Sequence, residues 1–292
     1  MLKATDAAAR IKDELKIEVA SALSHGIRPC LGVVFAGEHE ASVAYSRSKI
    51  RLAAELDVGL DIRYLPADVS QTKVVAEVLS LSAAPNVNGV IVELPLPPQA
   101  DLASVLSALD PVKDVDGAHL LNRGRLFRGD GPDGLFPVTP LACLELLKEA
   151  DVSLEGRKVT VVGRGETVGL PLAVLLIKMH ATVTVCHTRT ADLAEAVSGA
   201  DIVISAAGRP GLIAASMLRP GQTVVDAGIS VLPNGKIAGD VDPEASRVAA
   251  RVSPVPGGVG SLTSVLLFRN LLRAVRIQEN LRAGDSRDGN AV

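Results

Sequence analysis

Two residues that could transfer protons lie on one predicted helix. Tyr45 and Lys49 are four residues apart in the amphipathic stretch 41–56, and this spacing puts both on one helix face. On their own, Tyr and Lys at this spacing are usually an exposed ring and a solvated charge. Glu93, however, is the one charged residue in the apolar run VIVELPLP, near the carboxyl end of a predicted strand. A charge there needs a partner, and the Lys49 amine is the natural candidate.

An acidic loop follows this strand. Asp116 lies in the segment KDVDG, at a predicted domain junction where clefts usually form. Asp114 lies two residues earlier, and spacing alone does not decide which carboxylate is functional. The five histidines are not at metal-ligand spacing and the three cysteines form no C-x-x-C pair, so we expect no metal site and no disulfide framework.

A glycine-rich turn marks a second site. Gly163, Gly165 and Gly169 follow a Val-rich strand and open a helix, which is the context of a dinucleotide-binding turn. Glycine lets the backbone approach a pyrophosphate, and the helix N-terminus directs N–H groups at it. A tight turn without a ligand would have the same spacing, so the neighbouring residues decide between the two interpretations.

The next strand ends without the carboxylate that usually binds the ribose of NAD. It ends at Cys186, followed by Thr188 and Arg189, and Arg164 lies in the turn itself. A hydroxyl and two guanidinium groups suit a 2′-phosphate, so we predict NADP rather than NAD. The alternative is that both arginines are solvated surface charges, as Arg often is.

The elements that must position these residues alternate between strand and helix. Apolar residues make up 48% of the 292-residue chain and aromatic residues only 2%, which favours an α/β fold with parallel sheets built from Val, Leu, Ile and Ala. We expect an α/β substrate domain at 1–140 and a Rossmann-type dinucleotide-binding domain at 141–263. We also expect the last helix, within 264–292, to return to the first domain.

Several classes of partner are disfavoured. The formal net charge of -3 and the absence of a long basic run argue against nucleic acid and against an anionic membrane surface. The stretch 4–23 resembles a charged amphipathic helix without the apolar core of a signal peptide, and no apolar run is long enough to span a membrane. We therefore expect a cytoplasmic protein that binds a small molecule.

In nine segments, found in the same order, the chain resembles a known family, the bifunctional methylenetetrahydrofolate dehydrogenases and methenyltetrahydrofolate cyclohydrolases. They are ASVAYSRSK, GVIVELPLP, KDVDG, PVTPLA, VVGRGETVGLPLA, TVTVCHTRT, GRPG, GDVD and PVPGGVGSLT. The resemblance covers nearly the whole chain. It implies oxidation of 5,10-methylenetetrahydrofolate by NADP, followed by hydrolysis of the methenyl product to 10-formyltetrahydrofolate in one-carbon metabolism.

The resemblance also implies roles for individual residues. Lys49 matches the catalytic lysine, with Glu93 beside it, Tyr45 matches the residue that stacks on and orients the folate, and Asp116 matches the residue that binds the pterin ring. Further matched positions are Gly257 and Gly258 toward the substrate, and Ile229, together with the turn and Thr188, toward NADP. The family implies a homodimer that acts on tetrahydrofolate derivatives with or without a polyglutamate tail.

Several matched positions depart from the family pattern, and two of them, Glu93 and Gly165, bear on the two reactions. Glu93 stands where the family usually has Gln, and an ionised carboxylate favours the protonated form of the Lys49 amine. We therefore expect hydrolysis to be slow or shifted to higher pH, while hydride transfer survives. Gly165 stands where the family usually has Ser, which removes a hydroxyl near the phosphates and bears on the choice between NADP and NAD.

Three other functions fit parts of the sequence. The first is a dehydrogenase of the same family with weak cyclohydrolase activity, which the carboxylate at Glu93 would explain. The second is an oxidoreductase similar to shikimate dehydrogenase, acting on a ring hydroxyl or ketone with a Lys and an Asp. The third is an NADP-binding protein of the same fold without catalytic activity.

Overall fold

The computed structural model describes residues 1–37, 40–128 and 134–288. For residues 40–47 and 283–288 it describes the backbone only. Contacts divide the chain into two units. The Lys49 unit comprises Lys12–Phe136 and Leu267–Val292, and the Gly163 unit comprises Met1–Ile11 and Pro137–Leu266. Each unit is α/β, as the composition predicted, and each has its own parallel sheet.

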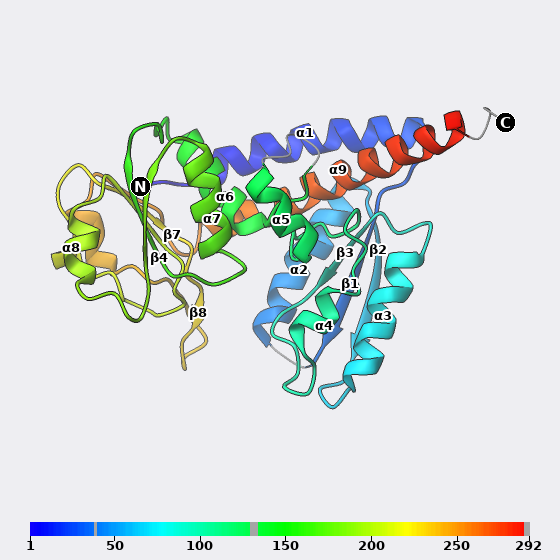
Figure 1. Ribbon diagram of the computed structural model, residues 1–292, viewed down its shortest axis with the longest axis horizontal. Coiled ribbons are helices and arrows are strands. Elements are labelled where there is room, and N and C mark those ends of the chain that lie inside the picture. Colours follow the sequence, from blue (N-terminus) through cyan, green and yellow to red (C-terminus); the bar gives the residue numbers. More distant parts are fainter. Residues whose placement is uncertain (38–39, 129–133, 289–292) are drawn as a thin grey trace. The chain divides into compact units, whose positions relative to one another are not determined.

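The Lys49 unit contains a three-stranded parallel sheet in the order β2-β1-β3. Its strands are β1 (Cys30–Ala36), β2 (Gly59–Leu65) and β3 (Gly89–Val92), and the helices between them are α2 (Glu40–Leu56) and α3 (Gln71–Ala83). Strand β1 is buried along nearly its whole length because it is central and apolar on both faces. The helices α2 and α3 lie on opposite sides of the strands (Figure 1). The sheet therefore places the end of β3 close to the helix α2.

The segment that follows β3 is more regular than expected. Strand β3 ends at Val92, sooner than the sequence run suggested, because the prolines at 95, 97 and 98 have no N–H to extend the ladder. Two short helices, α4 (Leu102–Leu106) and α5 (Leu120–Arg128), follow this strand and were not predicted from the sequence. The Asp101 carboxylate caps α4 by accepting from the Ser104 N–H at 2.8 Å.

The Gly163 unit contains a five-stranded parallel sheet in the order β10-β7-β6-β4-β5. Its strands are β4 (Lys158–Val162), β5 (Thr182–Cys186), β6 (Ile202–Ser205), β7 (Thr223–Asp226) and β10 (Arg251–Val252). The helices are α6 (Val138–Glu149), α7 (Gly169–Lys178) and α8 (Leu193–Ser198), with the 3-10 turns η1 (Ala215–Met217) and η2 (Pro243–Arg247). A small antiparallel hairpin joins β8 (Ser230–Val231) and β9 (Ile237–Ala238). This is the parallel, helix-covered sheet that the glycine-rich turn required.

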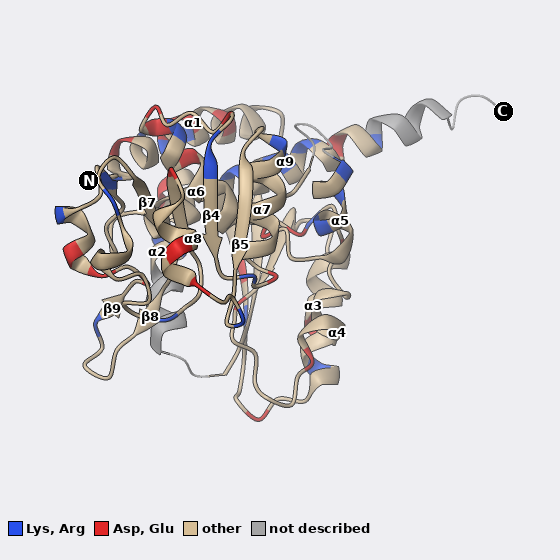
Figure 2. Ribbon diagram, turned by 60° about the vertical axis from the view of Figure 1, so that its left-hand side comes forward, with Lys and Arg blue, Asp and Glu red and all other residues tan. Residues whose placement is uncertain are grey.

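The first residues of the chain group with the Gly163 unit. The Leu2 N–H donates to the Val252 carbonyl at 2.8 Å and the Ala4 N–H donates to the Gly257 carbonyl at 3.2 Å. The helix α1 (Thr5–Ser24) then continues into the Lys49 unit. Acidic and basic residues are interspersed along α1 (Figure 2), consistent with a solvated face. The domain limits expected near 140 and 264 stay a prediction.

The last helix, α9 (Val259–Asp288), begins before the position expected from the sequence. From Leu267 onward it packs within the Lys49 unit, as the sequence predicted for the final helix. Asn270 is 1% exposed, and its side-chain amide donates to the carbonyls of Val115 at 2.8 Å and Phe136 at 3.0 Å. Gln278 donates in the same way to the Asn88 carbonyl at 2.7 Å. The polar face of α9 therefore fixes the loop that carries Asp116.

None of the described helices combines the length and the apolar content that a membrane-spanning segment needs.

Replacing Asn270 tests how strongly α9 holds this loop. Asn270→Ala leaves two carbonyls without their donor, and we expect the free energy of unfolding to fall by about 1–3 kcal/mol. Urea unfolding followed by circular dichroism measures this change. The matched control is Asn280→Ala, an exposed Asn on the same helix, where we expect a change within about 0.5 kcal/mol. Equal effects of the two variants would contradict the role of Asn270.

Candidate functional site

Lys49 and Glu93 form a buried ion pair in the Lys49 unit. The Lys49 Nζ contacts the Glu93 Oε1, and the two side chains are 7% and 10% exposed. Lys49 lies on α2, and Glu93 directly follows β3, where its own N–H donates to the Val34 carbonyl at 3.0 Å. The pairing predicted from the sequence is confirmed. A pair of opposite charges removed from water at the end of a parallel sheet is a chemically reactive feature and a costly one.

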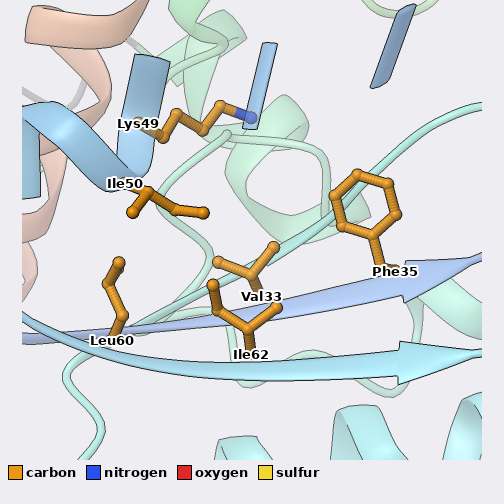
Figure 3. Close-up of a pocket in the computed structure, with 6 residues that line it drawn as sticks. All are labelled: Val33, Phe35, Lys49, Ile50, Leu60 and Ile62. Carbon is orange, nitrogen blue, oxygen red and sulfur yellow. The ribbon is translucent and has the colours of Figure 1, made fainter. Parts of the chain in front are cut away.

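The stem of Lys49 lies over an apolar surface. Figure 3 shows a small pocket under the lysine, lined by residues from α2 and the two strands beneath it: Val33, Phe35, Lys49, Ile50, Leu60 and Ile62. The Lys49 side chain runs above these apolar side chains, and its amine points away from Ile50 (Figure 3). Apolar packing therefore fixes the methylene stem, and the ion pair fixes the charged end.

Asp114 has a structural role in the acidic loop. Its carboxylate is fully buried and accepts from the backbone N–H groups of Ala118 at 3.0 Å and His119 at 2.8 Å, and from the Asn122 side chain at 2.8 Å. Burial raises the pKa of Asp114, and these hydrogen bonds oppose that shift. All three donors come from the chain that follows the loop, so Asp114 sets the loop's path.

Asp116 is the available carboxylate of this loop. Its side chain is exposed at the surface and accepts no hydrogen bond from any described residue. Protein atoms packed around the carboxyl group, together with the Asp114 carboxylate, raise the pKa of Asp116 to about 7, while Lys49 acts in the opposite direction. The charges of Lys49 and Glu93 both act on Asp116, which places the three groups in one electrostatic neighbourhood.

Tyr45 lies on α2 one turn before Lys49, as its spacing predicted. Its side chain lies outside the described residues.

The three glycines of the turn differ in what they tolerate. A Cβ on Gly163, whose φ is +116°, would lie 2.2 Å from the Ala206 carbonyl oxygen, and a Cβ on Gly169 would lie 2.1 Å from the Gly163 carbonyl oxygen. A Cβ on Gly165 would meet nothing within 4 Å. Packing of the backbone therefore requires Gly163 and Gly169, whereas the space at Gly165 is open.

The polar groups expected to bind a 2′-phosphate lie at the same edge of this sheet. Strands β4 and β5 are parallel neighbours, so the residues after Val162 and after Cys186 emerge side by side. Arg164, Thr188 and Arg189 are all exposed. Neither guanidinium group forms an ion pair within the described part of the chain. The arrangement leaves two cations and a hydroxyl available to an anion.

Two further carboxylates at this edge were missed by the sequence analysis. Asp226 ends β7 and Asp240 follows β9, and they are 3% and 0% exposed. Burial raises the pKa of Asp226 to about 6, although three backbone N–H groups donate to it. The available signal was a single Asp ending each of the apolar segments QTVVD and KIAGD.

The remaining expected residues belong to the Gly163 unit. Ile229 follows β7 and its side chain is 58% exposed. Gly257 has a φ of +105°, and a Cβ on Gly258 would lie 2.6 Å from the Pro254 carbonyl oxygen. The backbone of the PVPGGVG segment thus depends on glycine at both positions.

The difference in space around Gly163 and Gly165 can be tested by substitution. We expect Gly163→Ala to lower the free energy of unfolding by more than about 1 kcal/mol, because alanine at a positive φ is strained and its Cβ meets the Ala206 carbonyl. Gly165→Ala should change it by less than about 0.5 kcal/mol. Urea unfolding of the two variants measures the difference, and a larger loss for Gly165→Ala would show that the turn is held differently.

Two sequence models of one family match this chain. The first, described as the tetrahydrofolate dehydrogenase/cyclohydrolase catalytic domain, matches residues 2–116, and the second, described as the NAD(P)-binding domain of the same family, matches residues 137–279. Among curated relatives, the bifunctional protein FolD of Heliobacterium modesticaldum is 49% identical over 93% of this chain and 94% of its own length. FolD 2 of Desulfitobacterium hafniense is 45% identical over 92% and 94%.

Solved structures agree with these matches. The bifunctional FolD methylenetetrahydrofolate dehydrogenase/cyclohydrolase of Campylobacter jejuni is similar with a TM-score of 0.90 and 37% identity, over 95% of this chain and 98% of that one. The enzyme of Trypanosoma brucei, solved with NADP and an inhibitor, has a TM-score of 0.90 and 37% identity, over 94% and 97%.

Proposed function

The chain belongs to the tetrahydrofolate dehydrogenase/cyclohydrolase family, and on this premise we propose how its own residues serve the two reactions. The dehydrogenase oxidises 5,10-methylenetetrahydrofolate to the methenyl cation, and the cyclohydrolase hydrolyses that cation to 10-formyltetrahydrofolate. The observation that carries the proposal is the buried pair of Lys49 and Glu93.

Hydride transfer requires accurate placement more than a strong base. The methylene carbon gives up a hydride and becomes part of a cation delocalised over two nitrogens, so no proton has to leave in the same step. NADP supplies the hydride acceptor when it is bound. The chain's task is to hold the folate, and we assign this to Tyr45, Asp116, Gly257 and Gly258. Asp116 suits the pterin ring because its carboxylate is exposed and accepts no hydrogen bond from a described residue.

Hydrolysis requires movement of protons, and we assign this to Lys49. Water adds its oxygen to the methenyl carbon and gives up a first proton; N5 gains a proton as its bond to that carbon breaks, and the proton of the remaining hydroxyl is released to solvent as the formyl C=O forms. A neutral Lys49 amine can take the first proton and supply the second. Glu93 holds that amine in a buried ion pair, which ties up the group that must take the proton. We therefore assign proton transfer to Lys49 and control of its amine to Glu93.

The residues of the glycine-rich turn fit the phosphates of NADP. Gly163 and Gly169 allow the tight backbone packing of the turn, and the open space at Gly165 leaves room for a pyrophosphate at the N-terminus of α7. Arg164, Thr188 and Arg189 have the charge and hydrogen-bonding capacity for a 2′-phosphate. We propose that these residues, together with Ile229, bind the cofactor and favour NADP over NAD.

The other functions considered are not favoured, because both family models and relatives named for two activities match this chain. A homodimer, a cytoplasmic location and the absence of nucleic-acid and membrane partners stay predictions from the sequence. So does binding of polyglutamylated folate.

A paired assay of the purified protein tests the proposal. We expect NADPH to form from 5,10-methylenetetrahydrofolate, faster with NADP than with NAD, and 5,10-methenyltetrahydrofolate to disappear faster than in buffer alone. NADPH formation without enzymatic loss of the methenyl compound would leave a dehydrogenase only. Failure of both reactions, with NADP still bound, would reduce the chain to a binding protein.

Replacing Glu93 tests its effect on Lys49. In Glu93→Gln the carboxylate paired with the Lys49 amine is gone, so the amine is freer to take a proton from water and the cyclohydrolase rate should rise severalfold, with hydride transfer retained. Rates of methenyl loss across pH measure the change. The matched control is Glu77→Gln, which removes the carboxylate paired with Lys73 on α3. An unchanged profile in Glu93→Gln would rule out this role.

A further inference from the structure

The Asp240 carboxylate holds the loop that follows β6. Its Oδ2 accepts from the Ser205 hydroxyl at 2.9 Å and from the N–H groups of Ala207 at 2.6 Å and Gly208 at 3.2 Å, and its Oδ1 accepts from the Arg209 N–H at 2.7 Å. These donors are consecutive along the chain except for Ala206. One buried carboxylate therefore fixes the whole exit of β6.

That loop is in direct contact with the glycine-rich turn. The Ala206 N–H donates to the Val162 carbonyl at 2.7 Å, one residue before Gly163. The Ala206 carbonyl is also the group that leaves no room for a Cβ on Gly163. A movement of residues 206–209 therefore moves the surface against which the Gly163 backbone packs.

The Asp226 carboxylate holds the neighbouring segment. It accepts from the N–H groups of Gly228 at 3.0 Å, Asp240 at 3.0 Å and Val241 at 2.9 Å. The carboxylates leave no room for a side chain beside them: a Cβ on Gly228 would lie 2.2 Å from Asp240, and one on Gly239 would lie 2.0 Å from Asp226. Asp226 thus fixes both the backbone of Asp240 and the residue before Ile229.

Stability alone is a poor reason for this arrangement. Burying two carboxylates costs desolvation energy, and apolar residues of similar volume often stabilise a core as well or better. The hydrogen bonds that compensate these charges all come from loops after β6, β7 and β9 and from the last residue of β6. Ligands of open parallel sheets bind at the carboxyl ends of the strands.

We propose that Asp240 and Asp226 are positioning residues for the dinucleotide: Asp240 holds the loop 206–209 against the Gly163 turn, and Asp226 holds Asp240 and the segment leading to Ile229. The inference rests on the proposed function, because it presumes that this edge binds NADP. Neither carboxylate needs to touch the cofactor, since each acts through backbone N–H groups that it holds in place.

Steady-state kinetics of Asp240→Asn test the inference. The amide keeps the size of the side chain, but its NH2 group cannot accept from N–H donors, so the loop must shift. We expect the KM for NADP to rise about tenfold or more, because small displacements in a binding turn have large effects. The KM for methylenetetrahydrofolate and the cyclohydrolase rate, which needs no dinucleotide, should stay within about twofold.

The matched control is Asp242→Asn, the same chemical change two residues along. Asp242 caps η2 by accepting from the Glu244 N–H at 2.9 Å, and we expect its replacement to leave the KM for NADP unchanged. A smaller change at the first site, Ser205→Ala, removes one donor and keeps the carboxylate. It should raise the KM for NADP about two- to threefold if the hydroxyl helps to hold Asp240.

The kinetic pattern separates positioning from loss of fold. A smaller folded fraction lowers the apparent kcat at an unchanged KM, and that result in Asp240→Asn and Ser205→Ala would overturn the inference. A raised KM for NADP with normal cyclohydrolase activity would support it. If the unaltered protein neither bound nor reduced NADP, the proposed function itself would fail, which is a different outcome from equal KM values in an active enzyme.

Discussion

The structure depends on one physical constraint, which is that a charge removed from water must be compensated by partners of fixed geometry. In the Lys49 unit the constraint couples α2 to the end of β3 through Lys49 and Glu93, and couples the acidic loop to the chain after it through Asp114. In the Gly163 unit it couples three loops through Asp226 and Asp240. The buried polar side chains therefore fix the paths of these loops.

Much of the fold could be predicted from the sequence because alternating strands and helices leave few topologies, and because glycine and proline mark the ends of elements. The pairing of Lys49 with Glu93 was also predictable, since a lone charge in an apolar strand end has few possible partners. The choice between Asp114 and Asp116 was not. Their spacing is equivalent. Only the folded loop shows that the Asp114 carboxylate accepts hydrogen bonds from backbone N–H groups, whereas the Asp116 carboxylate accepts none from a described residue.

Apart from the pair of Lys49 and Glu93, contacts between segments distant along the chain could not be predicted from the sequence. The Asp240 carboxylate accepts hydrogen bonds from a loop more than thirty residues before it. The Asn270 amide donates to the carbonyl of Val115, which lies 155 positions earlier. No local period or motif encodes such pairs. They depend on which strands are neighbours, and that order is known only once the sheet has formed. The helices α4 and α5 were missed for a related reason: they are short, and the caps and side chains that stabilise them are contributed by the packed loop rather than by an apolar repeat.

The open space at Gly165 has a consequence for how this protein can change over evolutionary time. Its neighbours Gly163 and Gly169 are fixed by backbone contact, so mutations there are removed by selection for folding whatever the cofactor. Position 165 is free of that constraint although it lies in the same turn. A side chain added there would displace no part of the backbone. The turn can therefore accept a change at this one position without a compensating change elsewhere in the fold.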